Sequence, residues 1–396
     1  MLNSAVLVVA VLLFLVTLPG TIELVLISLG GLVRPRRSHE ASASPVSCRI
    51  AAIVPVHNEE ASLARTVLSL KACEDAVPDR DICVIVSNST DTSATIARQL
   101  GCTVLERNEP ERRGKGYGLN YAFRHLAGRG YDAFVIVDAD TLVERNFFNS
   151  FRAAFSRGAD AAQAVVRVSN PDENQRTRLI NIAFLAFTYL RPLARSRLGF
   201  SAGIFNGFGV SAKTVEDVPY ECFSLTEDLE YHLQLVRAGK RVQFLSGCSI
   251  YSEMSADGRE AAPQRARWEG GRFRLLADKG PNLALEVLRT RDPHRLEALL
   301  DLLLLPLAYQ TMLLGTLALT GPGVFRIYAV FGLLLIVFHV GQAMYLGGSK
   351  AKDLWALVVV PKYIAWKILT LPSIAKASAK NAIWRRTQRG HVQGAK

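Results

Sequence analysis

The chain has 396 residues, a formal net charge of +12 and a positive mean hydropathy of +0.18. This length exceeds one small domain and suits a sizeable domain with membrane segments, and a positive mean hydropathy is unusual for a soluble enzyme. No stretch alternates basic and aromatic residues as a nucleic-acid-binding face would, so we expect no nucleic-acid partner.

The first predicted element is a transmembrane helix in residues 1–33. Residues 4–33 are apolar over a length that crosses a bilayer, although Pro19-Gly20 could kink the helix and Glu23 is a charge inside it. A cleavable signal peptide fits less well, because the segment is too long and lacks a basic start and a cleavage site. Basic residues after this helix and in the tail follow the positive-inside pattern of membrane proteins. They are Arg34, Arg36, Arg37, Arg385, Arg386 and Arg389.

Residues 34–47 are basic and rich in Ser and Pro, which is typical of a linker. A folded domain is expected to follow over residues 48–290. The six cysteines form no C-x-x-C pair and have no regular spacing, so we predict reduced, mostly buried thiols of a cytosolic domain. The cysteines are Cys48, Cys73, Cys83, Cys102, Cys222 and Cys248.

Strand-like and helical segments alternate over residues 49–137. The strand-like runs are continuously apolar, which indicates a mostly parallel α/β sheet covered on both faces. Ligand sites in such sheets lie beyond the carboxyl ends of the strands, and polar residues at 57–59, 88 and 138–140 all lie there. The predicted strands are 49–55, 82–86, 103–106 and 133–137, and the predicted helices are 59–73, 92–100 and 118–126.

The later part of the chain is expected to contact a membrane. Residues 179–193 are apolar but short and flanked by arginine, which favours an amphipathic helix lying on the membrane, and residues 264–290 are similarly mixed. Within the segment 291–347, residues 296–320 and 324–346 are two predicted transmembrane helices.

The last apolar segment, residues 354–371, is ambiguous. It carries Pro361, Lys362 and Lys367, and a basic tail follows it. If it spanned the membrane, that tail would lie on the far side, against the positive-inside pattern. For residues 348–396 we therefore favour an interfacial or re-entrant segment and a basic cytosolic tail.

The D-A-D motif of Asp138 and Asp140 directly follows the apolar run F-V-I-V. Two carboxylates at the end of a buried strand are costly unless a cation neutralises them. A divalent ion that bridges a diphosphate suits this place, because Mg²⁺ and Mn²⁺ take carboxylate oxygens and substrate phosphates. The alternative is an acidic turn in solvent.

Two further motifs supply charges. The G-K-G motif at 114–116 places Lys115 in a flexible setting before a helix, whose first N–H groups could bind an anion. The T-E-D motif also precedes a helix, so Thr226 could be its N-cap, with Glu227 and Asp228 favoured by the helix dipole. An ionised carboxylate in this place would also suit a general base.

Gln264, Arg267 and Trp268 form a Q-x-x-R-W motif. Arginine binds phosphate through two hydrogen bonds and an aromatic ring stacks on sugars, whereas the alternative is a Trp/Arg belt at a membrane interface. Asn206 and Gly207 begin a glycine-rich turn, which could also be a plain tight turn.

The order of these motifs resembles a membrane-bound, processive-type glycosyltransferase of family 2, the group of cellulose, hyaluronan and chitin-oligosaccharide synthases and ceramide glucosyltransferase. The resemblance spans about residues 49–275 and implies a GT-A type domain. The chain departs from the family at Ser87-Asn88, where the family often has an acidic pair.

The resemblance implies roles for individual residues. Asp138 and Asp140 would hold the metal and the nucleotide diphosphate, and Asp228 would be the general base on the acceptor hydroxyl. Pro55, Glu59 and Asn88 would line the nucleotide pocket, and Gln264, Arg267 and Trp268 would lie over the diphosphate and acceptor. We also assign Lys115 to the nucleotide-sugar site, and Asn206, Gly207 and Glu227 to the acceptor and diphosphate side.

The expected reaction is inverting transfer from a nucleotide sugar, expected to be UDP-linked, that makes a β-glycosidic bond. A divalent metal, Mg²⁺ or Mn²⁺, would stabilise the leaving diphosphate. The acceptor would be a lipid or a polysaccharide, and the small membrane part favours a lipid-borne or short-chain acceptor. The expected location is a bacterial inner membrane with the catalytic domain cytosolic, and the expected partners are membrane lipids and export-complex subunits.

Two other classes of protein are possible. A non-catalytic assembly partner in a polysaccharide-export complex would have lost the D-x-D motif or the base, and both are present. A sugar-nucleotide pyrophosphorylase would share the sheet and the metal, but it predicts neither Q-x-x-R-W nor membrane anchors.

Overall fold

The computed structural model describes residues 2–34 and 48–379. Most of the predicted linker and the tail from residue 380 lie outside the described residues. The chain divides into two compact units, which we call the sheet unit and the helical unit. Among the described residues, the sheet unit contains 48–171 and 201–255, and the helical unit contains 2–34, 172–200 and 256–379.

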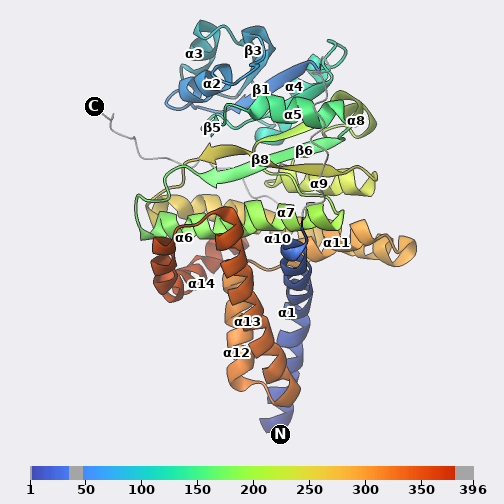
Figure 1. The fold of residues 1–396 in the computed structure, drawn as a ribbon, viewed down its shortest axis with the longest axis vertical. Coiled ribbons are helices and arrows are strands. Elements are labelled where there is room, and N and C mark those ends of the chain that lie inside the picture. The colour runs from blue at the N-terminus through green and yellow to red at the C-terminus, as the bar shows by residue number, and fades with distance from the viewer. Residues whose placement is uncertain (1, 35–47, 380–396) are drawn as a thin grey trace. The chain divides into compact units, whose positions relative to one another are not determined.

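The sheet unit is built on one eight-stranded sheet with the order β3-β2-β1-β4-β7-β6-β8-β5 (Figure 1). Strands β3, β2, β1 and β4 run parallel, as do β6 and β8, whereas β7 and β5 run antiparallel to their neighbours. The predicted α/β fold with a mostly parallel sheet is therefore confirmed. The strands are β1 (Ile50–Val56), β2 (Ile82–Ser87), β3 (Thr103–Arg107), β4 (Ala133–Ile136), β5 (Thr141–Val143), β6 (Ala161–Val168), β7 (Phe208–Ser211) and β8 (Val242–Ser252).

Helices cover the strands of the sheet unit. Helix α4 packs against β1 and β2, and α5 packs against β6 and β8. Val54, Ile85 and Val135 are fully buried, as expected for continuous apolar strands. All seven elements predicted over residues 49–137 form, with ends shifted by a few residues. The helices are α2 (Leu63–Lys71), η1 (Asp79–Asp81), α3 (Ser93–Gln99), α4 (Lys115–Leu126), α5 (Phe147–Ser156), α8 (Ala212–Asp217) and α9 (Glu227–Arg237).

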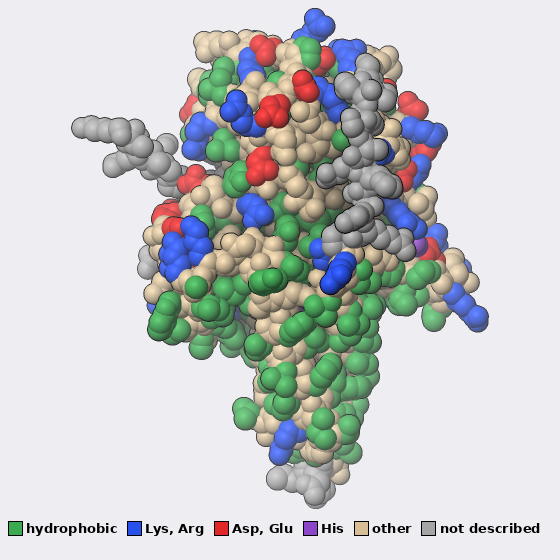
Figure 2. Space-filling view, in the orientation of Figure 1, with side chains coloured by type: hydrophobic (Ala, Val, Ile, Leu, Met, Phe, Trp, Pro, Cys, Tyr) green, Lys and Arg blue, Asp and Glu red, His purple; other side chains and the backbone are tan. Residues whose placement is uncertain are grey.

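In the helical unit, α1, α12 and α13 lie side by side (Figure 1). Helix α1 confirms the predicted N-terminal helix and continues through Pro19. Hydrophobic side chains cover much of the visible surface of these three helices (Figure 2). The helices are α1 (Leu2–Leu32), α6 (Gln175–Phe184), η2 (Leu185–Leu190), α7 (Arg191–Leu198), α10 (Gly258–Thr290), α11 (Pro293–Leu303), α12 (Leu307–Thr320), α13 (Gly323–Gly347), η3 (Ala351–Val359) and α14 (Val360–Ala377).

Three segments of the described chain are long and apolar enough to cross a membrane, namely Ser4–Leu32, Gly323–Gly347 and Ala351–Ala377. The predicted helix at 324–346 is confirmed as α13. Residues 179–193 and 264–290 are helical, but their position on a membrane stays a prediction. The segment Ala351–Ala377, which contains residues 354–371, is also long and apolar enough to cross a membrane. The predicted interfacial or re-entrant placement of residues 354–371 therefore stays a prediction.

The prediction of one continuous helix over residues 296–320 is wrong, whereas a membrane span there stays a prediction. Helices α11 and α12 meet there at an angle of 77°. Leu304 has an extended backbone with ψ of 116°, and Pro306 follows two residues later as the N-cap of α12. Proline lacks the N–H that a continuous helix needs, so the helix breaks before it. By length and composition, the pair could cross a membrane as one broken span or enter it as a re-entrant segment.

Glu23, the charge inside the first apolar helix, is 1% exposed, and its Oε1 lies 3.9 Å from Nε of Arg195. Arg195 also pairs with Glu297 and Asp301. Buried charges are costly unless they are paired, so this cluster explains how an apolar helix tolerates a glutamate. Its formal charges balance at three against three. The members are Arg191, Arg195, Arg272, Glu23, Glu297 and Asp301.

Candidate active site

The loops that follow β1 and β2 interlock through hydrogen bonds. Oδ1 of Asn58 accepts a bond of 2.7 Å from the backbone N–H of Thr90, and the carboxylate of Glu60 accepts bonds from the N–H and hydroxyl of Thr92. His57 Nδ1 lies 2.9 Å from the carbonyl oxygen of Ser87. These bonds hold together the loops at the carboxyl ends of two neighbouring parallel strands, which is where ligands of such sheets bind.

Asn88 lies in this edge with a φ of +53°, a conformation that asparagine tolerates better than most residues. Its Oδ1 accepts a bond of 2.7 Å from the N–H of Glu109, and its Nδ2 donates to the carbonyl of Glu109 at 3.2 Å. The carboxylate of Glu59 accepts a bond from the hydroxyl of Ser62 at 2.9 Å. Pro55 lies in β1 beyond the end of its pairing with β4 at Ile53. A nucleotide role for Pro55, Glu59 and Asn88 stays a prediction.

The D-A-D turn after β4 is held by hydrogen bonds from two distant segments. The hydroxyl of Thr66 on α2 donates to the carbonyl of Ala139 at 2.9 Å. The backbone N–H of Asp138 donates to Oδ1 of Asn206 at 3.0 Å, and Nδ2 of Asn206 donates to the hydroxyl of Thr141 at 2.7 Å. Asn206, predicted to lie near the diphosphate, therefore positions the backbone of the D-A-D turn.

Gly207 completes this support. Its φ is +72°, and a Cβ there would lie 2.5 Å from Cδ1 of Ile250. Only glycine fits both conditions, and a role of this turn beyond its structure stays a prediction.

Lys115 connects the D-A-D turn to the T-E-D segment. Its Nζ lies 2.7 Å from Oδ1 of Asp138 and 3.9 Å from Oε1 of Glu227. Burial alone would lower the pKa of Lys115, but the carboxylates of Asp138, Glu227 and Asp228 outweigh it and raise this pKa above its usual value. The structure thus gathers three predicted carboxylates, Asp138, Glu227 and Asp228, around the ammonium group of Lys115.

Glycines make this gathering possible. Helix α4 begins at Lys115, directly after Gly114, whose φ of +123° is disfavoured for other residues. A Cβ on Gly116 would lie 1.9 Å from the carbonyl oxygen of Cys222. The start of α4 therefore touches the segment that leads into T-E-D, and its free N–H groups could face an anion.

Thr226 is the N-cap of α9, as one interpretation of the sequence required, but its side chain makes no capping hydrogen bond. Glu227 is 9% exposed, and Asp228 is half-buried. Oδ1 of Asp228 accepts a bond of 2.8 Å from the N–H of Leu229. The two carboxylates at the start of α9 therefore differ, since Glu227 is the more buried and faces Lys115.

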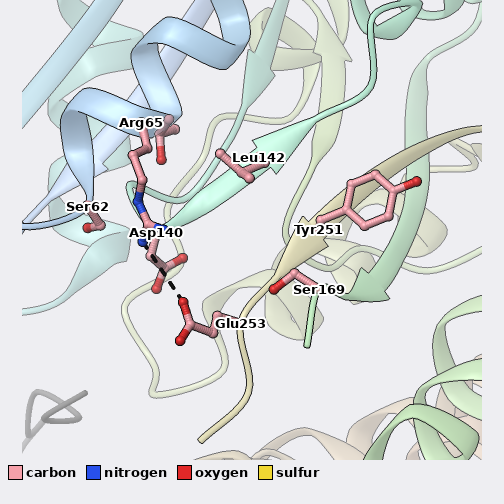
Figure 3. A pocket seen from close by; sticks show the side chains of 8 residues that line it. Ser62, Arg65, Asp140, Leu142, Ser169, Tyr251 and Glu253 are labelled. Carbon is pink, nitrogen blue, oxygen red and sulfur yellow. Dashed lines mark ion pairs between the residues drawn. The ribbon is translucent and has the colours of Figure 1, made fainter. Parts of the chain in front are cut away.

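A small cavity lies beside Asp140 (Figure 3). Arg65 and Glu253, which line it, form an ion pair of 3.9 Å, and Ser62 and Tyr251 also line it. Asp140 therefore shares this cavity with the cation of Arg65, and none of these lining residues was predicted from the sequence. Thr66 and Thr141 were missed for the same reason, because their contacts join segments far apart in the chain.

The site could hold a divalent metal only with help from a substrate. Within residues 2–34 and 48–379 no group of three or more His, Cys, Asp or Glu side chains forms a metal site. Asp138 and Asp140 offer two carboxylates, and one oxygen of Asp138 already pairs with Lys115. Magnesium is commonly bound by one or two carboxylates together with water and substrate phosphates, so the residues present fit such an ion.

The Q-x-x-R-W residues lie on α10 in the helical unit, not in the sheet unit with the other motifs. The indole of Trp268 is 36% exposed, and its ring lies 6.5 Å from that of Phe184. A role of Gln264, Arg267 and Trp268 over the diphosphate and acceptor stays a prediction.

All six cysteines are free and buried, which confirms that part of the sequence prediction. Burial raises the pKa of Cys73 to about 11 and that of Cys83 to about 12. Burial therefore makes Cys73 and Cys83 poor nucleophiles.

The sequence and the fold are similar to those of known glycosyltransferases. A hexosyltransferase of low-salt glycan biosynthesis, Agl6 of Haloferax volcanii, is 30% identical over 97 residues, which are 24% of this chain and 22% of that protein. Protein RfbJ of Shigella flexneri is 32% identical over 94 residues, 24% of this chain and 66% of that protein. The chain thus matches less than two thirds of the length of either relative.

Among solved structures, the mannosyltransferase PcManGT from Pyrobaculum calidifontis, in complex with GDP-Man and Mn²⁺, has a similar fold. The TM-score is 0.54 at 19% identity, with 88% of this chain and 99% of that chain covered. The family model described as "Glycosyltransferase like family 2" matches residues 48–271, more than half of the sequence. The GT-A type fold is thereby confirmed, and the chain belongs to glycosyltransferase family 2.

Proposed function

We propose that the chain transfers a sugar from a nucleotide sugar, expected to be UDP-linked, to an acceptor at a membrane surface. The observation that carries the proposal is the convergence of Lys115, Asp138, Glu227 and Asp228 at the carboxyl end of the sheet. A cation among carboxylates suits a diphosphate leaving group, whose negative charge must be compensated as the glycosidic bond breaks.

Asp138 and Asp140 would hold Mg²⁺ or Mn²⁺ when donor is bound. Such an ion would supply neutralisation of the diphosphate. Lys115 would add a second positive charge on the same side, and Asn206 would keep the D-A-D turn in place through its bond to the N–H of Asp138. The relative with a similar fold is bound to GDP-Man and Mn²⁺, which supports a nucleotide sugar and a divalent ion for this chain also.

Asp228 would act as the general base. Its carboxylate would take the proton of the acceptor hydroxyl while the acceptor oxygen attacks the anomeric carbon. The bond from that carbon to the diphosphate breaks, and the nucleoside diphosphate leaves on the opposite face. This displacement inverts the anomeric centre and would give a β-glycosidic bond from an α-linked donor.

The acceptor would be lipid-borne or a short polysaccharide, used at the cytosolic face of a bacterial inner membrane. Three apolar segments that could cross a membrane support this location. Membrane lipids and subunits of an export complex would be partners.

Purified intact chain, supplied with membrane lipids and Mn²⁺ or Mg²⁺, tests the proposal. We expect one nucleoside diphosphate to be released from a panel of UDP- and GDP-linked sugars, and we expect release to stop in EDTA. No release from any donor under any metal condition would favour the non-catalytic assembly partner.

A further inference from the structure

Two arginines of the helical unit lie against aromatic rings of α14. Cζ of Arg176 on α6 lies 4.9 Å from the ring centre of Trp366, and Cζ of Arg265 on α10 lies 5.3 Å from that of Tyr363. The two rings are themselves 5.7 Å apart. The two guanidinium groups are therefore neighbours on one aromatic surface, which we call the arginine pair.

The arginine pair has no carboxylate in ion-pair contact in the described chain. Nε and one terminal nitrogen of Arg176 are buried without a hydrogen-bond partner among the described residues. Asp257 acts on Arg176 from a greater distance and is exposed to solvent. Burial and the charge of Arg265 lower the pKa of Arg176, so Arg176 lies in an excess of positive charge.

The neighbouring charges do not correct this excess. Lys367 on α14 pairs with Glu269 on α10, so those two charges cancel. The cluster around Glu23 in the same unit shows the opposite case, because its three arginines face three carboxylates. The cluster around Glu23 is balanced in charge, whereas the arginine pair has no ion-paired carboxylate and Arg176 has two buried nitrogens without a hydrogen-bond partner among the described residues. An anion would neutralise the arginine pair and accept hydrogen bonds from Arg176.

The surroundings indicate the kind of anion. Helix α14 is fixed closely on α10, since a Cβ on Gly270 would lie 2.7 Å from Cβ of Ala377. The outer surface of α14 and η3 is strongly apolar, with Leu369 78% and Trp355 74% exposed. A charged site next to an exposed apolar surface matches a molecule that has an anionic head and an apolar tail.

We propose that Arg176 and Arg265 bind the phosphate group of an anionic membrane lipid, whose acyl chains lie along the apolar surface of η3 and α14. Arginine binds phosphate oxygens through two parallel N–H donors, and an aromatic ring can remain stacked on the same guanidinium. Because Arg265 lies inside the Q-x-x-R-W segment, a bound lipid would also fix the position of that part of α10. The inference rests on the membrane placement proposed above and not on the transfer reaction.

Lipid binding to the intact chain in neutral detergent tests this site by native mass spectrometry, without any sugar donor. The ligands are dioleoyl phosphatidic acid, dioleoylglycerol and inorganic phosphate. We expect phosphatidic acid to bind, dioleoylglycerol to bind much more weakly, and inorganic phosphate not to compete at equal concentration. The double variant R176Q/R265Q should bind phosphatidic acid roughly ten- to hundredfold more weakly, as expected for lost hydrogen bonds to a charged group.

The matched control is R274Q/R295Q, which also removes two charges from the helical unit. Arg274 pairs with Asp278, and Arg295 pairs with Glu286 and Asp292, so these arginines should not be available to a lipid. If the double variant does not fold, R176K/R265K keeps the charges and should retain partial binding. Equal binding of phosphatidic acid and dioleoylglycerol, or an equal loss in both double variants, would overturn the proposal. Failure of sugar transfer alone would leave it standing, because binding is measured without turnover.

Discussion

At the scale of single residues, the site separates the roles of two adjacent carboxylates. Glu227 is buried, and its Oε1 lies 3.9 Å from Nζ of Lys115, so its negative charge is compensated by the charge of Lys115. Asp228 is half-buried and accepts a bond from the N–H of the next residue. A base must reach an acceptor hydroxyl, and the more exposed Asp228 suits that task better.

We predict that Asp228→Asn lowers turnover by about 10²- to 10⁴-fold, the usual contribution of a general base. The amide is nearly the same size and can still accept the N–H of Leu229 through its oxygen, so nucleotide affinity should change little. Turnover and nucleotide affinity measured on the same preparation check this.

Glu230→Gln is the matched control, because Glu230 lies on the same helix and accepts a backbone N–H from Ser224. It should keep near wild-type turnover. If Asp228→Asn also kept it, Asp228 would have a structural role at the helix start, and Glu227 would become the candidate base.

At the scale of elements, the sequence predicted the helices and strands that depend on a local pattern of apolar and polar residues. Continuous apolar runs identified β1 to β4, and their polar ends identified the edge where Asn88 and Asp138 lie. The bend at Pro306 was missed, because the apolar pattern continues through it and a proline inside an apolar run only sometimes breaks a helix. The contacts of Thr66 and Asn206 with the D-A-D turn join segments far apart in the chain, so no local pattern could reveal them.

The close packing of helix α4 against the segment before T-E-D can be tested at Gly116. We predict that Gly116→Ala destabilises the protein by about 1–3 kcal/mol and lowers activity, because the added methyl group would overlap the carbonyl of Cys222. Thermal unfolding and nucleoside diphosphate release measure the two effects.

Gly118→Ala on the same helix is the control. A Cβ there would meet Ile85 at 3.6 Å, an ordinary contact, and alanine favours a helix over glycine by up to about 1 kcal/mol. This variant should be as stable as wild type or more stable. Equal melting temperatures for both variants would show that α4 and the segment before T-E-D do not pack as described.

At the scale of the whole molecule, the membrane topology is open to a direct test. We predict that a cysteine introduced at Pro322 is labelled by a membrane-impermeant maleimide from the cell exterior, whereas one introduced at Arg37 is labelled only after permeabilisation. The six native cysteines should react little, because all are buried and burial raises the pKa of Cys248 to about 12.

The chain without introduced cysteines is the background for this labelling. Reaction at position 322 only after permeabilisation would reverse the topology, and with it the cytosolic placement of the catalytic domain. Reaction at position 37 in intact cells would do the same.

The central claim is that a metal held by the D-A-D turn assists sugar transfer, and the activity of Asp140→Ala in the intact chain tests it most directly. The control is Asp217→Asn, which alters a surface carboxylate of the same unit that pairs with Lys240. We predict that release of nucleoside diphosphate stops in Asp140→Ala with the fold intact, persists in Asp217→Asn, and in the wild type stops in EDTA and returns with Mn²⁺ or Mg²⁺. Full activity of Asp140→Ala, or of the wild type in EDTA, would contradict the account.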